Sequence, residues 1–273
     1  MILVNDQFIP RENVHIDIED RGYQFGDGIY EVIRVYDGKI FRLDQHLLRL
    51  ERSAKEIKLV LPMSIQEIKE KITKLIAINN LSTGIVYFQV TRGVAPREHS
   101  FPNNRVSVLT AYTTEKERPL DKIQNGIKVV TTEDIRWLRC DIKTINLLGN
   151  VLAKQFAIEN QADETIQIRN NIVTEGSSSN FFIVKNGNLY THPANNFILK
   201  GITRDVVEEI AQKLGIKFIE QEFSLNEVYK ADEAFITSTT VEIMPVLQVN
   251  DTKISHQPGQ ITKTLQNEFS KLL

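Results

Sequence analysis

The chain has 273 residues, of which 41% are hydrophobic and 25% are charged, a composition typical of a soluble globular protein. Lys and Arg number 33 against 35 Asp and Glu, so the formal net charge is -2 and neither nucleic acid nor an anionic membrane is an expected partner. No apolar run approaches the roughly 20 residues that span a bilayer, and the N-terminus lacks a signal-peptide pattern. The single cysteine, Cys140, cannot form an internal disulfide, and we expect a cytoplasmic protein.

The first part of the chain mixes predicted helices and strands. A helix is expected over residues 44–59 with Asp44 as its N-cap, and Ser64 with Glu67 forms a capping box for the next helix. The loop-like segment 21–32 is rich in glycine and aromatic residues and enters a strand. Further strands are predicted at 2–9, 39–43, 84–92 and 105–112.

The second part begins after a polar segment, residues 113–124, which has no periodicity and is the expected linker. Strands predicted beyond it alternate with helical patterns, so we expect an α/β (α+β) fold with a small N-terminal domain, 1–118, and a larger C-terminal domain, 119–273. The functional site is expected between the two domains. The strands are 127–131, 164–168, 180–184 and 234–237, and the helices are 146–160, 203–214 and 259–273.

Lys143, in R-C-D-I-K-T, precedes the first of these helices among apolar neighbours. Desolvation lowers the pKa of a lysine, which is what a Schiff-base lysine requires. A solvated surface lysine is the alternative for this segment alone.

The run E-G-S-S-S-N-F-F begins at Glu175 and enters a strand. A carboxylate can hold the protonated nitrogen of a pyridine ring, and the backbone N–H groups and hydroxyls of Ser178 and Ser179 can meet phosphate or carboxylate oxygens. The alternative is a turn in which the serines satisfy local backbone groups.

Two further segments could bind an anion. In L-K-G-I-T-R, Gly201 permits a tight backbone and Thr203 is expected to cap a helix, whose free N–H groups form an anion site. In T-S-T-T, which begins at Thr237, hydroxyls could close a phosphate cup. The alternatives are a simple helix cap and a solvated strand end.

Together, Glu175-x-Ser-x-x-Asn-Phe-Phe, Leu189-x-Thr and Leu199-x-Gly-Ile-x-Arg resemble the signature of the fold-type IV (class IV) aminotransferases that use pyridoxal 5′-phosphate (PLP). The resemblance implies that PLP lies between the domains, that Lys143 holds it and acts as the catalytic base, and that Glu175 pairs with its ring nitrogen. It also implies a phosphate arginine, Arg49, in H-L-L-R, which shares a helix face with His46. The other implied cofactor residues are Ser178, Ser179, Leu199, Gly201, Ile202, Thr203, Ser238 and Thr239.

The segment R-G-Y-Q-F-G-D-G-I-Y-E-V resembles the D-amino-acid branch of that family, with Tyr30 on one strand face and Glu31 on the other. The loop T-R-G-V-A-P-R-E-H-S-F-P matches the same branch more specifically. The resemblance implies that Tyr30, Arg97 and His99 bind the substrate carboxylate, with Glu31 and His46 supporting the direct contacts. It also implies a homodimer in which Arg97 and His99 cross the interface.

The implied reaction transfers an amino group from a D-amino acid such as D-alanine to a 2-oxo acid such as 2-oxoglutarate, giving pyruvate and D-glutamate, without a metal. An L-branched-chain aminotransferase or an aminodeoxychorismate lyase of the same fold remains an alternative. A serine hydrolase would need a G-x-S-x-G elbow, which the serine run lacks. A non-catalytic scaffold would leave Lys143 without a role.

Overall fold

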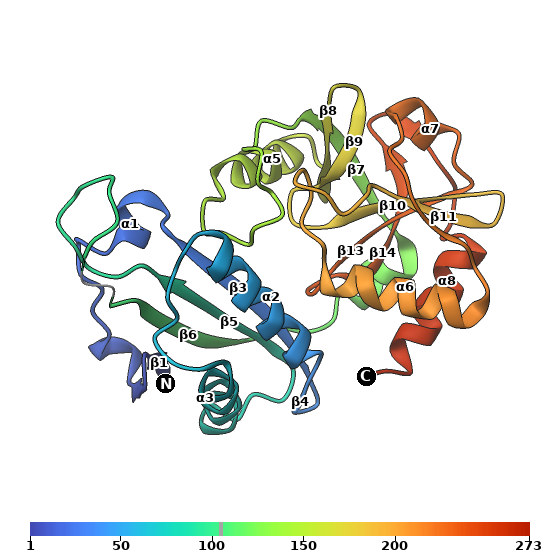
Figure 1. Ribbon diagram of the computed structural model, residues 1–273. Coiled ribbons are helices and arrows are strands. Elements are labelled where there is room, and N and C mark those ends of the chain that lie inside the picture. The colour runs from blue at the N-terminus through green and yellow to red at the C-terminus, as the bar shows by residue number, and fades with distance from the viewer. Residues whose placement is uncertain (104–105) are drawn as a thin grey trace. The chain divides into compact units, whose positions relative to one another are not determined.

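The computed structural model describes residues 1–103 and 106–273 (Figure 1). It is a mixed α/β structure that divides into two compact units. Unit 1 comprises Met1–Glu117 and Ile142–Leu147, and unit 2 comprises Arg118–Asp141 and Leu148–Leu273. The expected domains are two continuous stretches, whereas the short segment that carries Lys143 clusters with unit 1.

Unit 1 contains a six-stranded antiparallel sheet with helices on one face (Figure 1). Its strands are β1 (Ile2–Val4), β2 (Gln7–Ile9), β3 (Gly28–Tyr36), β4 (Lys39–Ile40), β5 (Gly84–Thr91) and β6 (Val108–Glu115), in the order β2-β1-β6-β5-β3-β4. Its helices are η1 (Arg11–Asn13), α1 (Arg21–Phe25), α2 (Leu43–Glu56) and α3 (Ile65–Ile78). The core forms where the apolar faces of α2 and α3 meet β3, β5 and β6.

Successive side chains of β3 point alternately toward the core of unit 1 and toward the opposite face of the sheet. Ile29, Ile33 and Val35 belong to the core beneath α2 and α3, and Glu31 shares their face because successive strand residues point to opposite sides. Tyr30 therefore lies on the other face, as the sequence predicts.

Several local predictions for unit 1 are wrong in detail. Residues 2–9 form a hairpin rather than one strand, because Asn5 adopts a φ of 52° and turns the chain between β1 and β2. Asp44 is not an N-cap: α2 begins at Leu43 after Arg42, whose φ is 57°. A short helix, α1, capped by Asp20, occupies part of the expected loop 21–32.

The capping box of α3 is confirmed, with Glu67 N donating to Ser64 Oγ (3.2 Å) and Ser64 N donating to Glu67 Oε2 (2.8 Å). The predicted strand 105–112 begins only at Val108 and continues to Glu115; its first expected residue, Arg105, lies outside the described residues. The linker is shorter than expected, because the next helix begins at Leu120.

Unit 2 is built on a nine-stranded mixed sheet. Its strands are β7 (Ile127–Glu133), β8 (Glu164–Arg169), β9 (Ile172–Gly176), β10 (Asn180–Lys185), β11 (Asn188–Thr191), β12 (Phe218–Glu220), β13 (Glu233–Ser238), β14 (Glu242–Val249) and β15 (Thr252–Lys253). The order is β12-β11-β10-β13-β14-β7-β8-β9, with β15 paired to β14. Strand β9 lies at one edge of this sheet and β10 lies near the opposite edge, yet only the short turn 177–179 joins them. The sheet must therefore curl to bring the two strands together.

The helices of unit 2 cover this curled sheet. They are α4 (Leu120–Asn125), α5 (Leu148–Glu159), α6 (Ile202–Leu214), α7 (Leu225–Tyr229) and α8 (Gln260–Ser270). Helix α6 packs beside α8 against β13, and α5 lies against β7 and β8 (Figure 1). The predicted helices 146–160, 203–214 and 259–273 are confirmed to within three residues at each end.

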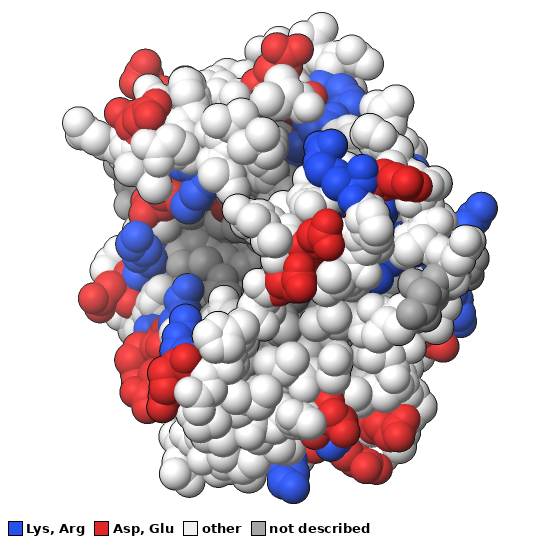
Figure 2. Space-filling view, turned by 90° about the vertical axis from the view of Figure 1, so that its left-hand side faces the viewer, with Lys and Arg blue, Asp and Glu red and all other residues white. Residues whose placement is uncertain are grey.

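Charged side chains of both signs lie on the face drawn in Figure 2. Basic side chains (blue) and acidic side chains (red) occur near one another there, among wider areas of uncharged residues (white). Within residues 1–103 and 106–273, every helix is too short or too polar to cross a membrane.

Candidate active site

Lys143 and Tyr30 are neighbours in unit 1. The Lys143 carbonyl accepts a hydrogen bond from Tyr30 N (3.0 Å), and the Lys143 amide donates to Ser53 Oγ (3.3 Å). The Lys143 ammonium lies 4.1 Å from the centroid of the Tyr30 ring. Among the described residues, no carboxylate pairs with this ammonium, so the amine is not engaged by an acid.

Glu31, His46 and Arg49 form a buried polar cluster between β3 and α2. Glu31 Oε1 accepts from Arg49 Nε (2.7 Å), and Glu31 Oε2 accepts from Arg49 Nη2 (2.8 Å). His46 Nδ1 lies 2.7 Å from Glu31 Oε2. This fork holds the guanidinium in one orientation, because both of its bonds end on a single rigid carboxylate.

The pKa values of Glu31 and His46 depend on each other and on the charge of Arg49. Burial alone would raise the pKa of Glu31, but the charge and hydrogen bonds of Arg49, with help from His46, lower that pKa to about 2. Burial lowers the pKa of His46, although Glu31 opposes the change. Glu31 is therefore ionised at neutral pH and keeps Arg49 in place.

A pH dependence follows. Because the pKa of Glu31 is about 2 in the folded state against 4.5 ordinarily, its contribution to stability is complete above about pH 4.5 and is lost as the pH falls toward 2. The free energy of unfolding should drop through this group by roughly 3 kcal/mol over that range. Urea unfolding of the parent protein and Glu31→Gln at several pH values measures the difference.

The exposed carboxylate of Glu12 provides the control. Glu12→Gln should keep the acid slope of the parent, whereas Glu31→Gln should flatten it and lower stability at neutral pH by leaving Arg49 unpaired. An unchanged slope in Glu31→Gln would show that Glu31 is not held in its charged form.

Arg97 and His99 lie on the exposed loop that follows β5. The Arg97 guanidinium carbon lies 5.0 Å from the centroid of the Phe25 ring, and the His99 ring lies 5.6 Å from it. Within the described part of unit 1, no hydrogen bond or ring contact joins either residue to Tyr30 or Lys143. The structure thus brings Lys143 beside Tyr30 and sets Arg97 beside His99 as a separate group.

Glu175 is the central residue of a buried polar cluster in unit 2. Its buried carboxylate accepts from Arg136 Nη1 (2.5 Å), Asn180 Nδ2 (3.0 Å) and Leu199 N (3.1 Å). Burial raises the pKa of Glu175, while Arg136 and the Leu199 amide oppose that rise. These three donors fix the orientation of the carboxylate.

Arg136 and Asp134 are site residues that the sequence did not single out. Asp134 accepts from Arg136 Nε (2.9 Å) and Nη2 (2.9 Å), and also from Thr174 Oγ1 (2.9 Å). Burial alone would lower the pKa of Arg136, but Glu175 and Asp134 raise it above its ordinary value, so the guanidinium stays charged. The D-I-R spacing was the available signal, since residues i and i+2 of an extended segment share a face.

The serines after Glu175 are held by another buried carboxylate, Glu164. It accepts from Ser177 Oγ and Ser177 N, the latter at 3.2 Å. Ser178 Oγ and Ser179 Oγ also donate to it, at 3.3 and 3.4 Å. Glu164 was not predicted, because its partners lie far along the chain.

The first turn of α6 has backbone N–H groups that find no partner within the helix. Gly201, not the predicted Thr203, is the N-cap, and it offers no side-chain cap. Gly201 N donates to Asn180 Oδ1 (3.1 Å), and a Cβ at this position would approach that oxygen to 2.4 Å, so a larger residue would displace the Asn180 amide. The amides of Ile202 and Thr203 in the first turn remain for an anion.

Hydroxyl groups gather at the end of β13. Thr237 Oγ1 is buried with no hydrogen-bond partner in the described residues, an arrangement that costs free energy unless a ligand or water fills it. Ser238 ends the strand, with its Oγ 3.4 Å from Thr240 Oγ1, and Thr239 follows in the turn. These hydroxyls and the free amides of α6 are donors suited to phosphate oxygens.

Comparison with known proteins gives a consistent result. The Amino-transferase class IV model matches residues 28–249. The chain is 48% identical over 274 residues to a D-alanine aminotransferase of Staphylococcus epidermidis, covering 100% of this chain and 97% of that protein.

Two solved structures share the fold. A branched-chain amino acid aminotransferase of Escherichia coli has a TM-score of 0.95 at 28% identity and covers 99% of this chain and 93% of its own. The branched-chain aminotransferase of the thermophilic archaeon Thermoproteus uzoniensis, solved with norvaline, has a TM-score of 0.89 at 27% identity, with 99% and 93% covered. The predicted α/β fold and family are confirmed: the chain belongs to the class IV aminotransferases.

Proposed function

We propose that this enzyme transfers an amino group from a D-amino acid, such as D-alanine, to a 2-oxo acid, such as 2-oxoglutarate, with PLP as cofactor. The observation that carries the proposal is the Lys143 ammonium 4.1 Å from the Tyr30 ring centroid, which sets a base beside a carboxylate ligand. The full-length relative named D-alanine aminotransferase supports the D-amino acid as substrate.

The residues present fit PLP. Its ring aldehyde would meet Lys143, its ring nitrogen would face the oriented carboxylate of Glu175, and Leu199 and Gly201 would line the adjoining backbone. Its phosphate would meet Arg49, the free amides of Ile202 and Thr203, and hydroxyls that include the unpartnered Thr237 Oγ1. When bound, PLP supplies an electron sink for the bond to the substrate Cα. The other proposed cofactor-binding residues are Ser238 and Thr239, together with Ser178 and Ser179, whose hydroxyls donate to Glu164.

In the proposed mechanism, each residue of this chain has one task. Lys143 Nζ would remove the proton at the substrate Cα as general base and, once protonated, would return that proton from the same side as general acid. Glu175 would keep a proton on the ring nitrogen, because Arg136, Asn180 and the Leu199 amide hold its carboxylate in one orientation. Tyr30 OH, Arg97 and His99 hold the α-carboxylate, which sets the enantiomer that presents its hydrogen to Lys143.

The assembly is proposed to be a homodimer in the cytoplasm. Its support is the resemblance of residues 91–102 to a loop that crosses a subunit interface, together with the exposure of Arg97 and His99. The single cysteine, Cys140, is buried and forms no disulfide, which suits a reducing compartment.

An L-branched-chain aminotransferase is the second candidate, because the solved structures reported above carry that name. The Arg-x-His loop favours the D-amino acid, as does the higher identity to the staphylococcal relative. Initial rates with 2-oxoglutarate and either D-alanine or L-leucine decide between them. Fast pyruvate formation from D-alanine with little activity on L-leucine is expected; the reverse pattern would establish the second candidate. Cleavage of aminodeoxychorismate without any 2-oxo acid acceptor would indicate the lyase instead.

Arg97→Ala tests the carboxylate clamp. Removing one charged donor from a desolvated carboxylate costs roughly 1.5–3 kcal/mol, so KM for D-alanine should rise about ten- to a hundredfold. Cofactor content, read from absorbance, should not change, because Arg97 is not proposed to touch PLP. An unchanged KM would exclude Arg97 from carboxylate binding.

Mixing variants tests the shared site. If the loop serves the partner subunit, heterodimers of Arg97→Ala and Lys143→Ala should contain one intact site and regain activity after subunit exchange. Verified heterodimers without activity would mean that Lys143 and Arg97 act within the same chain.

A further inference from the structure

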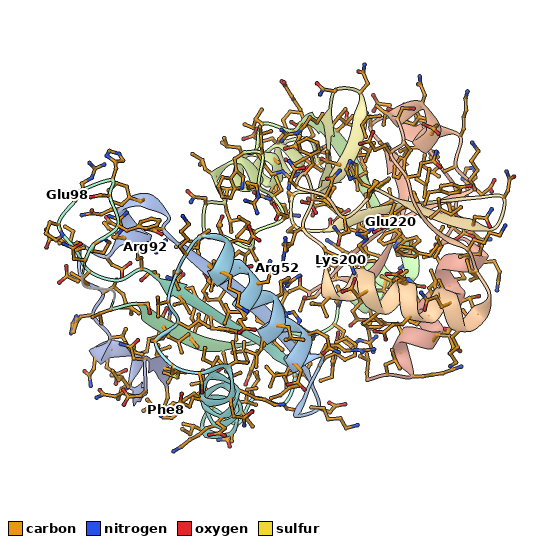
Figure 3. All side chains as sticks on the ribbon, viewed as in Figure 1. Phe8, Arg52, Arg92, Glu98, Lys200 and Glu220 are labelled. Carbon is orange, nitrogen blue, oxygen red and sulfur yellow. The ribbon has the colours of Figure 1, made fainter. Side chains whose placement is uncertain are left out.

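The loop of residues 96–102, here called the clamp loop, contacts the body of unit 1 through a hydrogen bond and several aromatic rings. Arg21 Nη1 donates to the carbonyl of Glu98 (2.6 Å). The His99 ring packs on Phe25 at 5.6 Å between centroids. The Arg92 guanidinium carbon lies 3.7 Å from the centroid of the Phe101 ring. Figure 3 labels Arg92 and Glu98 in this part of unit 1, with Phe8 well away from them.

Arg21 is the central residue of this attachment. Its side chain is only 4% exposed, and Nε donates to Asp27 Oδ2 (2.9 Å) while the guanidinium carbon lies 4.8 Å from the Phe25 ring centroid. Arg21 therefore joins α1 to the loop through the bond from Nη1 to the Glu98 carbonyl. A charge-assisted bond of this kind fixes geometry more firmly than a neutral one.

Asp27 extends the attachment to Arg92. Both arginines donate to Asp27, with Arg92 Nε at 2.8 Å, so one carboxylate orients two guanidinium groups that reach the loop. Arg92 also donates to the carbonyls of Ile57 (2.8 Å) and Lys58 (2.9 Å). Those bonds connect it to the chain just beyond α2, and the anchoring thus spans three separate segments of unit 1.

The Phe25 ring supports Arg97 and His99 without covering the groups that would bind a carboxylate. Arg97 and His99, two residues apart, both lie against this ring, while both side chains are exposed to solvent. In the part of the chain that the structure describes, the Arg97 side chain makes no hydrogen bond or ion pair. Its polar atoms are therefore available although its position is set.

We propose that Arg21 and Phe25 are positioning residues that hold Arg97 and His99 ready for a carboxylate. This inference rests on the clamp assigned under the proposed function. An exposed loop without these contacts must be ordered by the substrate itself, and that cost reduces apparent affinity. Arg21 and Phe25 touch neither Lys143 nor Glu175 among the described contacts. Replacing either residue should therefore change KM for the substrate rather than kcat.

The holoenzyme of Arg21→Met provides the test. KM for D-alanine should rise about ten- to a hundredfold, the range for displacing a binding group by about 1 Å, while kcat stays within about twofold of the parent. Amide hydrogen exchange across residues 97–101 should quicken. Arg21→Lys keeps a cation able to reach Glu98 and should restore part of the affinity.

Lys71→Met is the matched control. Lys71 Nζ also donates to a backbone carbonyl, that of Asp6 (2.8 Å), and also lies over an aromatic ring, Phe8 (5.8 Å), but far from the clamp loop. It should leave KM and the exchange of residues 97–101 unchanged. Phe25→Leu is the second variant, needed if Arg21→Met does not fold, and should repeat the rise in KM.

Three results overturn the inference. In the first, folded Arg21→Met keeps the KM and the amide exchange of the parent although Arg97→Ala raises KM. That result would support the carboxylate clamp but show that Arg21 does not position it. A parallel loss of kcat and stability without recovery in Arg21→Lys would show a general structural role. An unchanged KM in Arg97→Ala would remove the clamp of the proposed function, and this inference with it.

Discussion

Lys143→Ala is expected to abolish both turnover and the covalent linkage to PLP. The parent holoenzyme should be yellow and should be labelled irreversibly by borohydride at Lys143, since only a lysine amine can form the reducible bond. In the variant the label should disappear and transamination should fall by several orders of magnitude, because the Cα proton loses its base. Absorbance, mass spectrometry of the reduced protein and steady-state rates measure these effects.

The substitution should leave the fold intact. The backbone bonds of Lys143 to Tyr30 and Ser53 do not involve its side chain, so the unfolding midpoint should stay near that of the parent. Lys69→Ala, which removes an exposed lysine paired with Asp44, is the control and should keep the label and the rate. Full activity in Lys143→Ala would end the assignment of this lysine.

Glu175→Gln should lower turnover by orders of magnitude while PLP still binds. Glutamine keeps the shape of the carboxylate and an oxygen for the Leu199 amide, which lies 3.1 Å from Glu175. It removes the negative charge that favours a protonated ring nitrogen, and the positive charge of Arg136 is then no longer balanced at that position. The electron sink weakens, so kcat falls more than KM rises.

Glu233→Gln is the matched control, since Glu233 is also a buried carboxylate of unit 2. It accepts from Thr262 N (2.8 Å) and Ile261 N (2.9 Å) at the start of α8. Its replacement should lower stability by weakening that helix terminus, with kcat retained in the folded fraction. Equal losses of kcat in Glu175→Gln and Glu233→Gln would mean that Glu175 acts only through stability.

Periodic patterns predicted the elements that tertiary packing reinforces. Ile68, Ile72, Leu75 and Ile76 repeat at helical spacing, and all four are buried in α3. The predictions failed where a single backbone angle decides the outcome. Asn5 turns the chain with a positive φ, so two three-residue strands had the pattern of one longer strand.

Capping was also ambiguous at short range. Asp44 and Thr203 are both residue types that favour an N-cap, yet each lies in the first turn of a helix that starts one residue earlier. Arg42 and Gly201 occupy the cap positions instead, because their backbone conformations are set by the preceding segment. Residue preference alone does not contain that information.

Some residues of the candidate site could be predicted from the sequence, and others become evident only in the folded structure. Lys143 and Glu175 could be proposed because the longer signature resembles a known family; their local motifs alone also allowed a surface lysine and a simple turn. Arg136 could not, because its importance arises from a 2.5 Å contact with Glu175, which lies 39 residues away. Glu164 is similar, since its bonds to Ser177 and its neighbours form only when β8 and β9 pair.

The chirality of the product tests the central claim most directly. The purified holoenzyme is incubated with D-alanine and 2-oxoglutarate, and the glutamate formed is separated by chiral chromatography. The clamp of Tyr30, Arg97 and His99 fixes one substrate face toward Lys143, so the account predicts D-glutamate in amounts equal to the pyruvate produced. L-glutamate as the main product, or glutamate formed only when L-alanine or L-leucine replaces D-alanine, would contradict it.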